Sequence, residues 1–349
     1  PSKCGKIEKY LGFQYKCIAS KGHIREIKKV YSRKYNYKPE YEIIKEKYGV
    51  VREMQSIVSQ FDPKNVLLGT DDDREGESIA WHICKVCDLD IATTPRILFR
   101  EITQKALLDA VKNPTKIRMN IVHAQQARQV VDRMIGFKIS PLLSKLIVHD
   151  SKSFLSAGRC QTPTLRLVYD RHQESKRLKD SGIFYKVEGD FVDNPTISVK
   201  LNVKFDHVEK VHLFFEKSKT FSHILSIFPK VNRSSSPPQP FSTSKLLQHA
   251  STVLHLSPKV TMDMCQKLYQ GGYITYMRTE SVRYSTTYLR QAKEYITDHY
   301  GESYVGGTDR IQNNDSNNPH EAIRVTQLFM REVEDVKLQS LYNVIWRRS

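Results

Sequence analysis

A strand, an acidic loop and a helix follow one another between residues 66 and 87. The apolar run Val66–Gly69 predicts a strand, and the helical spacing of apolar residues in 74–87 predicts a helix. The acidic residues of this stretch are Asp71, Asp72, Asp73, Glu75 and Glu77, five within seven positions. A loop that leaves a strand for a helix lies at the carboxyl end of that strand, where α/β proteins form their sites. The stretch therefore predicts an α/β unit with carboxylates gathered at one edge of its sheet.

Two explanations account for the acidic loop. Asp71 and Asp73 can project to one side of it, and Glu75 can join them from the first turn of the helix. Carboxylate oxygens suit a hard cation, and Mg²⁺ takes one or two carboxylates while it keeps several waters. The alternative is that acidic side chains favour the N-terminus of a helix through its dipole, which explains one or two of the five. We therefore predict that Asp71, Asp73 and Glu75 bind Mg²⁺.

Residues 1–115 repeat the alternation of short apolar runs with helical segments. Further strands are predicted at Tyr15–Ala19 and Arg96–Phe99, and helices at 41–60 and 74–87. Strands that alternate with helices pair in parallel through right-handed crossovers. This part of the chain is therefore expected to contain a parallel sheet.

The sequence pattern changes three times after residue 115. Apolar residues recur at three and four positions in 116–175, which predicts a helical segment. Alternating β-branched and aromatic residues predict a β-rich segment in 176–236, and the Ser/Pro run 234–240 marks a boundary. Residues 237–349 return to helical spacing. The expected fold class is therefore multidomain, with an α/β domain, a helical segment, a β-rich segment and a second helical domain.

The charge of the 349-residue chain indicates a polyanionic partner. Lys and Arg number 55 against 38 Asp and Glu, a net charge of +17 at pH 7, which favours nucleic acid first and an acidic membrane second.

Because the chain has neither 18 consecutive apolar residues nor a secretory signal, and only six scattered cysteines, we expect a soluble intracellular protein with reduced thiols. No G-x-x-x-x-G-K-[ST] motif is present, so no site for nucleotide hydrolysis is visible. The start at Pro1 and the end within an apolar helical pattern lead us to expect a fragment.

The run Gly271–Ser281 contains a candidate nucleophile. Tyrosine is a weak nucleophile at its ordinary pKa of about 10 and needs a neighbouring cation or base. In extended backbone Arg278 lies on the same side as Tyr276 and can hold a phosphate under attack. The chain has 18 tyrosines, however, and spacing alone does not select this one. Further basic and polar runs, which in isolation fit solvated turns, are 20–23, 132–137, 156–162 and 319–324.

Taken together and in order, these segments resemble the type IA DNA topoisomerases. The Asp71-x-Asp73-x-Glu75 run resembles the metal motif of the Toprim domain of that family. The other resembling segments are 1–12 and Ala19–Arg25 (the first loop and helix of that domain and its Ala-Ser-x-Gly-His segment), Ser156–Leu165 (the Ser-Ala-Gly-Arg-x-Gln-Thr-Pro-Thr-Leu element) and Ile274–Ser281 (the active-site Ile-Thr-Tyr-Met-Arg-Thr-Asp-Ser).

The resemblance implies a role for each matching residue. Tyr276 would form a 5′-phosphotyrosyl link with one DNA strand, Arg278 would hold the scissile phosphate, and Lys3 would stabilise the developing charge. His320 is the fourth catalytic residue that it implies. The implied DNA-binding residues are His23, Arg128, Asp132, Phe137, Arg159 and Gln161, with Phe137 placed to stack on an unpaired base.

The implied organisation assigns a part of the family fold to each segment. The four parts are a Toprim-like metal-binding α/β domain (1–115), a helical DNA-binding base segment (116–175), a β-rich arch segment (176–236) and a helical domain with the active-site tyrosine (237–349). The implied partner is a single-stranded segment of negatively supercoiled DNA, and the protein is expected to be a monomer. It would lie with the DNA, in a nucleus, a nucleoid or a viral factory.

The implied activity is cleavage and rejoining of one DNA strand, which relaxes negative supercoils. A phosphodiester exchanged for a phosphotyrosine ester changes little in energy, so no ATP is needed. One alternative is a decatenase of the topoisomerase III kind. The sequence of Gln161–Leu165 resembles the motif of that branch, whereas the sequence of Ile274–Ser281 resembles the motif of the topoisomerase I branch. The other is a non-catalytic binder of single strands, favoured by the fragment-like ends.

Overall fold

The computed structural model divides the chain into two compact units, described separately below. The first unit combines Pro1–Val130 with Ser236–Ser349, and the second is Val131–Ser235. The structure describes residues 3–33, 36–147, 154–179, 182–192, 195–232, 235–313 and 320–349. Residues 1, 2, 234 and 319 of the runs discussed above lie outside these ranges. The division into four parts stays a prediction.

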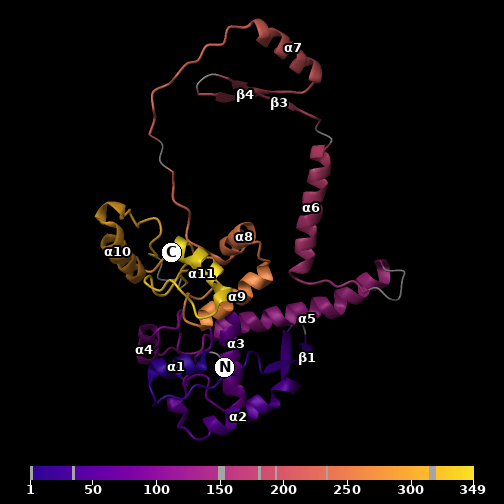
Figure 1. The fold of residues 1–349 in the computed structure, drawn as a ribbon. Helices are drawn as coiled ribbons and strands as arrows, with labels where there is room; N and C mark the ends of the chain where they lie inside the picture. Colours follow the sequence, from indigo (N-terminus) through magenta and orange to yellow (C-terminus); the bar gives the residue numbers. More distant parts are fainter. Residues whose placement is uncertain are drawn as a thin grey trace. The chain divides into compact units, whose positions relative to one another are not determined.

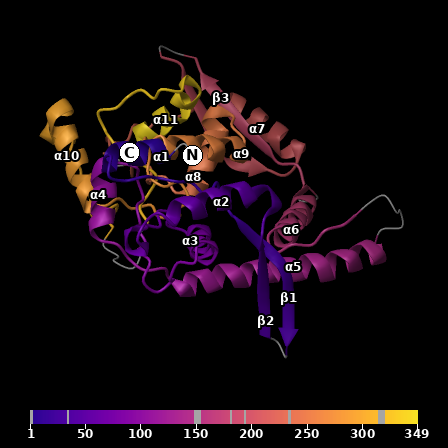
Figure 2. The same ribbon diagram turned by 90° about the horizontal axis from the view of Figure 1, so that it is seen from below.

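The N-terminal part of the first unit mixes helices with one hairpin (Figure 1). Its elements are α1 (Cys4–Leu11), β1 (Arg25–Arg33), β2 (Asn36–Ile43), the 3₁₀ turn Lys45–Lys47, α2 (Tyr48–Val58), the 3₁₀ turn Pro63–Asn65, α3 (Arg74–Val86), α4 (Gln104–Lys112) and the start of α5 (Met119–Ile147). Strands β1 and β2 are antiparallel, with Arg25 opposite Ile43, and form the two-stranded ribbon seen in Figure 2.

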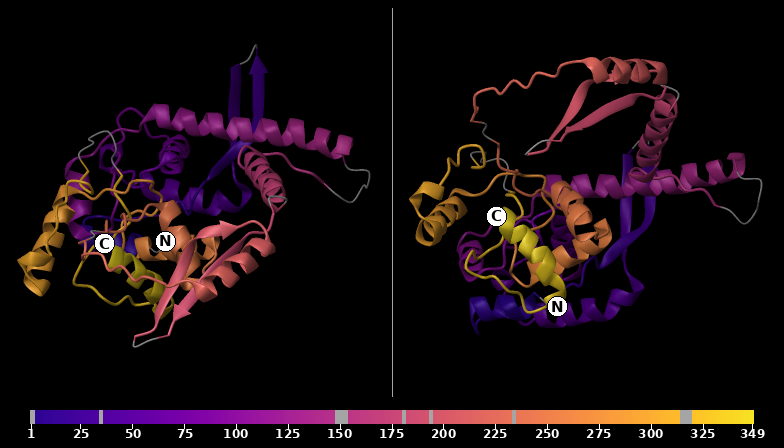
Figure 3. Two further views of the ribbon diagram at one scale, coloured as in Figure 1. Left: turned by 90° about the horizontal axis from the view of Figure 1, so that it is seen from above. Right: turned by 45° about the horizontal axis from the view of Figure 1, so that its top comes forward.

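The C-terminal part of the first unit is helical. Its elements are α8 (Thr243–Leu254), α9 (Pro258–Gln270), α10 (Thr286–Tyr300), the 3₁₀ turn Glu302–Tyr304 and α11 (Val336–Arg348). Each α-helix begins at a side-chain cap that accepts a hydrogen bond from a backbone N–H of the first turn: Ser242, Ser257, Ser285 and Asp335. Helices α8, α9 and α11 pack against one another (Figure 3).

One hydrophobic core joins the two sequence segments of the first unit. From the N-terminal segment it contains Ile7 of α1 and Ile102 just before α4. From the C-terminal segment it contains Leu268 of α9, Leu341 of α11, and Ile274 in the chain between α9 and α10. Burial of this apolar surface is the main force that holds segments more than 150 residues apart in sequence next to each other. Tyr276 belongs to the same core. The candidate nucleophile therefore lies on a rigid support.

The second unit contains the rest of α5, then α6 (Gln161–Lys179), β3 (Tyr185–Phe191), β4 (Ile197–Phe205) and α7 (Val208–Thr220). Strands β3 and β4 form an antiparallel hairpin with Tyr185 opposite Phe205. This confirms strands inside the predicted β-rich segment, whereas a helix at Val208–Thr220 was not predicted. Of the described part of the chain, no helix has both the length and the apolar character needed to cross a bilayer.

Three predictions for residues 1–115 need correction. The strand predicted at Tyr15–Ala19 is absent, because Cys17 donates its N–H to the Glu8 carboxylate at 2.7 Å rather than to a strand. The helix predicted at 41–60 starts at Tyr48, since the preceding residues end strand β2. The predicted parallel sheet, with its strands Val66–Gly69 and Arg96–Phe99, is absent: among the described residues of this region it reduces to a single parallel bridge between Leu68 and Arg96.

Candidate active site

The acidic loop folds back on the first turn of α3. Asp73 caps this helix: its backbone is extended and its Oδ1 accepts a hydrogen bond from the N–H of Gly76 at 2.7 Å. The hydroxyl of Thr70 donates to the carbonyl of Gly76 at 2.6 Å. A Cβ atom at position 76 would lie 2.0 Å from the carbonyl oxygen of Asp71, so only glycine fits there. These contacts fix the direction in which the aspartates project.

The segment that carries Tyr276 passes through the unit as an extended chain. The backbone N–H of Tyr276 donates to the carbonyl of Arg100 at 2.8 Å, and the N–H of Thr275 donates to the carbonyl of Arg324 at 2.9 Å. Gly272 begins the segment with φ +70°, and a Cβ there would lie 2.6 Å from the carbonyl of Ile102. The backbone thus holds the tyrosine directly against Arg100, in the extended segment that follows Arg96.

The phenol of Tyr276 meets the acidic loop at Asp73. Its hydroxyl donates to Oδ2 of Asp73 at 2.5 Å, and Nη1 of Arg278 lies 3.4 Å from the same oxygen. Tyr276 is 4% exposed, and burial, followed by the charge of Asp73, raises its pKa well above the usual value for tyrosine. The phenol is therefore neutral at rest, and the group placed to accept its proton is Asp73.

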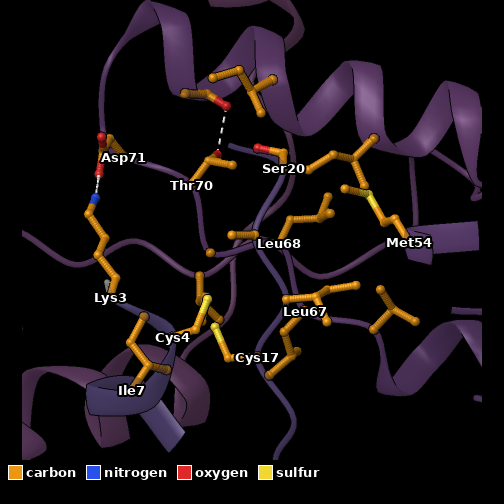
Figure 4. Close-up of a pocket in the computed structure, with 18 of the residues that line it drawn as sticks. Lys3, Cys4, Ile7, Cys17, Ser20, Met54, Leu67, Leu68, Thr70 and Asp71 are labelled. Atoms are coloured by element: carbon orange, nitrogen blue, oxygen red, sulfur yellow. Dashed lines mark hydrogen bonds and ion pairs between the residues drawn. The ribbon is translucent and has the colours of Figure 1, made fainter. Parts of the chain in front are cut away.

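Lys3 brings a positive charge to the neighbouring aspartate. Its ammonium lies 2.5 Å from Oδ1 of Asp71 (Figure 4) and 4.7 Å from the centre of the Tyr269 ring. Lys3 and Asp71 line a cavity of about 1110 Å³. Asp73 also borders this cavity, and apolar residues such as Leu67 and Leu68 form another part of its lining. The structure thus brings Lys3, Asp71, Asp73, Tyr276 and Arg278 together.

Two further carboxylates, Asp72 in the loop and Glu77 in the first turn of α3, are neutralised by buried or half-buried arginines. Asp72 accepts from Arg118 at 2.6 Å and from Arg100 at 3.2 Å. Glu77 accepts from Arg118 at 2.8 Å, and Arg96 lies 3.4 Å away. Burial acts to raise the pKa of Asp72, but the hydrogen bond from Arg118 and the charges of both its arginines outweigh burial and lower it. These two carboxylates therefore belong to a structural network rather than to a set of free ligands.

Sequence reasoning missed the three arginines of this network. Arg96, Arg100 and Arg118 come from segments that the sequence pattern assigns to a strand end or to helix starts. One signal was available: the acidic run holds more carboxylates than a Mg²⁺ ion needs, so some of them require basic partners.

Glu75 has a separate set of partners. Its Oε2 lies 3.1 Å from Nε2 of His23 and accepts from Gln125 at 2.9 Å, and Arg128 lies 4.0 Å from Oε1. The hydrogen bond with His23 is the largest of the effects that lower the pKa of Glu75. Within the described ranges, no three His, Cys, Asp or Glu side chains converge as a metal site. Carboxylate oxygens on Asp71 and Asp73, with waters, nevertheless form a donor set that suits Mg²⁺.

His320 lies near the acidic loop. Burial lowers its pKa, and the charge of Asp72 acts in the opposite direction, with smaller effects from Arg100, Arg118 and Asp73. Its imidazole is half-buried, and its catalytic role stays a prediction.

The remaining predicted DNA-binding residues belong to the second unit. Arg159 donates to both carboxylate oxygens of Asp132, at 2.9 and 3.2 Å, and Gln161 donates to Ser156 at 3.0 Å. Phe137 is 71% exposed on α5, with the guanidinium of Arg133 5.2 Å from its ring centre. An exposed aromatic ring beside a cation suits stacking with a nucleobase.

Comparison with known proteins supports one family for both parts of the site. A family model described as DNA topoisomerase matches residues 116–349, and one described as Toprim domain matches residues 1–102. The fold is similar to that of full-length topoisomerase I from Thermotoga maritima, with a TM-score of 0.80 and 34% sequence identity. The match covers 100% of this chain and 58% of that chain. The Toprim match contains the acidic loop and the topoisomerase match contains Tyr276, and the chain therefore belongs to the type IA DNA topoisomerases.

Proposed function

We propose that the chain carries the cleavage site of an enzyme that breaks and rejoins one DNA strand and so relaxes negative supercoils. The single observation that carries this proposal is the hydrogen bond between the Tyr276 hydroxyl and Asp73, with Arg278 on the same carboxylate. It joins a nucleophile, a proton acceptor and a phosphate-binding cation.

In the proposed reaction the Tyr276 oxygen attacks a phosphodiester of the bound strand. The phenolic proton passes to the Asp73 carboxylate, a bond forms between the tyrosine oxygen and phosphorus, and the bond from phosphorus to the 3′ oxygen breaks. Arg278 and Lys3 offset the negative charge that develops on the phosphate oxygens. Rejoining reverses these steps, with the 3′ hydroxyl as nucleophile and the tyrosine as leaving group. Because one ester replaces another, strand passage needs no nucleotide hydrolysis.

We propose Asp71 and Asp73 as the Mg²⁺ ligands of the Toprim domain; Asp73 would bind the ion only when its Oδ2 holds neither the Tyr276 hydroxyl nor its proton, which it would pass on to water. Glu75 completes the acidic motif, and as a ligand it would exchange its bonds with His23 and Gln125 for the ion. The ion would supply positive charge near the reacting phosphate. Lys3 already compensates the charge of Asp71, so it orients this carboxylate whether or not an ion is present.

We propose that the partner is a single-stranded segment of DNA. The net charge of +17 supports affinity for phosphates. The exposed ring of Phe137 and the paired side chains of Asp132 and Arg159 would contact the unpaired strand. The motif Ile274–Ser281 favours relaxation, whereas Gln161–Leu165 favours decatenation. The relative rates on supercoiled and catenated circles would separate the two.

The first prediction tests the nucleophile in the intact protein. Tyr276→Phe is expected to abolish the covalent protein–DNA adduct that denaturant traps, and relaxation with it, because the attacking oxygen is gone. Tyr288→Phe is the matched control, since Tyr288 is as deeply buried in a separate cluster. An adduct that survives Tyr276→Phe contradicts the assignment. A wild-type protein that binds single strands but leaves no adduct would instead be the non-catalytic binder.

A further inference from the structure

A second tyrosine lies between two groups of the proposed cleavage site. Tyr269, at the end of α9, is fully buried. The ammonium of Lys3 lies over one face of its ring, 4.7 Å from the centre. The Tyr276 ring meets the Tyr269 ring edge to face, with centroids 5.2 Å apart and planes at 68°. One aromatic ring thus contacts both the cation at Asp71 and the phenol at Asp73.

The neighbouring lysine and tyrosine repeat the same type of contact. Lys6, one turn along α1 from Lys3, lies over the Tyr273 ring at 5.1 Å and also donates to the carbonyl of Gly271. Lys3 at the N-cap of α1 and Lys6 in its first turn therefore face Tyr269 in α9 and Tyr273 just after it. This pairing fixes the first turn of α1 against the loop that leads to the nucleophile.

The hydroxyl of Tyr269 does not explain why a tyrosine stands there. Among the described atoms it is buried without a hydrogen-bond partner, which is an unfavourable arrangement for a phenol. Burial and the charges of Asp71, Asp72 and Asp73 raise its pKa, so the group stays neutral. An aliphatic residue would fill the same volume without burying an unpaired hydroxyl. However, an aliphatic side chain lacks the negatively charged face of an aromatic ring, which attracts the ammonium of Lys3.

We infer that Tyr269 is a positioning residue for strand cleavage, whose ring holds the Lys3 ammonium at Asp71 and the Tyr276 phenol at Asp73. The inference rests on the proposed function. Misplacement of a reacting group by about 1 Å can cost about a hundredfold in rate, so a fixed support for both groups matters to the chemistry.

The test varies the charge distribution of the ring without changing its size. Phenylalanine and its mono-, di- and trifluorinated forms are introduced at position 269 of the intact protein, and single-turnover cleavage of a single-stranded oligonucleotide is measured. Fluorine withdraws electron density from the ring face, so the cleavage rate is expected to fall stepwise, with the trifluorinated ring about tenfold slower than phenylalanine. A rate that does not change along the series overturns the inference.

A second background shows whether the effect acts through Lys3. In Lys3→Met the ammonium is absent, so the cleavage rate is expected to be the same for every ring of the series. A fall of equal steepness in both backgrounds would mean that the ring does not act through Lys3, and would overturn the inference. Thermal unfolding of each variant confirms that equal amounts of folded protein are compared.

Tyr288 provides a matched control outside the proposed site. It is buried, its hydroxyl has no hydrogen-bond partner among the described atoms, and the guanidinium of Arg324 lies over its ring at 4.2 Å. The same series at position 288 is expected to change the unfolding temperature but not the cleavage rate. If Tyr276→Phe still forms the adduct, the proposed function fails. If Tyr276→Phe is inactive and the series at 269 has no effect, the positioning inference alone fails.

Discussion

At the scale of single residues, Asp73 combines tasks that are usually kept apart. One carboxylate oxygen caps α3 and the other accepts the hydrogen bond from Tyr276. The cap was predictable, because an acidic residue commonly precedes a helix. The contact with Tyr276 was not predictable from spacing, since the two residues are 203 positions apart. Only the resemblance to a family connected them.

His82 is a buried histidine whose charge state affects folding. Its side chain is fully buried on α3 between Tyr41 and Trp81, and neither ring nitrogen has a hydrogen-bond partner among the described atoms. Burial, together with the charges of Arg25 and His23, lowers its pKa to about 3. The folded state therefore excludes a proton that the unfolded chain binds below about pH 6.5.

The charge state of His82 predicts a pH dependence of stability. Because the folded pKa is depressed, its stabilising contribution is present above pH 6.5 and is lost as pH falls towards 3. Between pH 6.5 and 5 the free energy of unfolding should fall by about 2 kcal/mol through this group. His82→Phe should remove that part of the slope in urea titrations at several pH values. An unchanged slope in the variant would show that His82 is not the responsible group.

At the scale of elements, helices were easier to predict than strands. The helix after the acidic loop was predicted at 74–87 and lies at Arg74–Val86, because its cap and its apolar spacing are local signals. The predicted strand at Tyr15–Ala19 is absent because a side chain, Glu8, takes the hydrogen bond that a strand would have made. Strands depend on distant partners, which a single sequence does not reveal.

Gly76 tests how closely the acidic loop must approach α3. Gly76→Ala places a methyl group 2.0 Å from the Asp71 carbonyl oxygen, so the loop must move. We expect a loss of about 1–3 kcal/mol in stability and a larger loss in cleavage, because the loop carries Asp71 and Asp73. Gly49→Ala in α2 is the control, since a Cβ there meets nothing within 4 Å. Chemical denaturation and single-turnover cleavage measure the two effects, and equal results for the two variants would contradict the close approach.

At the scale of the whole molecule, the sequence predicted which chemical groups the site contains better than it predicted how distant parts of the chain bring those groups together. The acidic motif, the excess of positive charge and the candidate tyrosine were visible in the residues themselves. The arginines that neutralise Asp72 and Glu77 were not visible, because Arg118 lies 46 and 41 positions along the chain from these two carboxylates and no sequence pattern connects them. The ring of Tyr269 escaped notice for the same reason, since its contact with Lys3 joins residues that lie far apart in the sequence.

The separation of chemistry from binding leads to a prediction for the whole chain. Asp71→Asn combined with Asp73→Asn should abolish Mg²⁺-dependent relaxation, because the proposed ligands and the proton acceptor for Tyr276 are lost. Binding of single strands should persist and tighten slightly, since removal of two negative charges favours phosphates. Asp263→Asn with Asp298→Asn, two exposed aspartates of α9 and α10, makes the same change of charge away from the site and should leave relaxation intact.

Salt titrations make this comparison decisive. The logarithm of the binding constant should fall with the logarithm of salt concentration, with nearly the same slope for all three proteins, because the slope counts the phosphates that Lys and Arg contact rather than the carboxylates. Binding that is independent of salt would contradict the phosphate contacts that the net charge of +17 predicts. Relaxation that survives in the Asp71 and Asp73 double variant would contradict the metal assignment, since the neighbouring carboxylates Asp72 and Glu77 are already paired with arginines and are poorly placed to replace them.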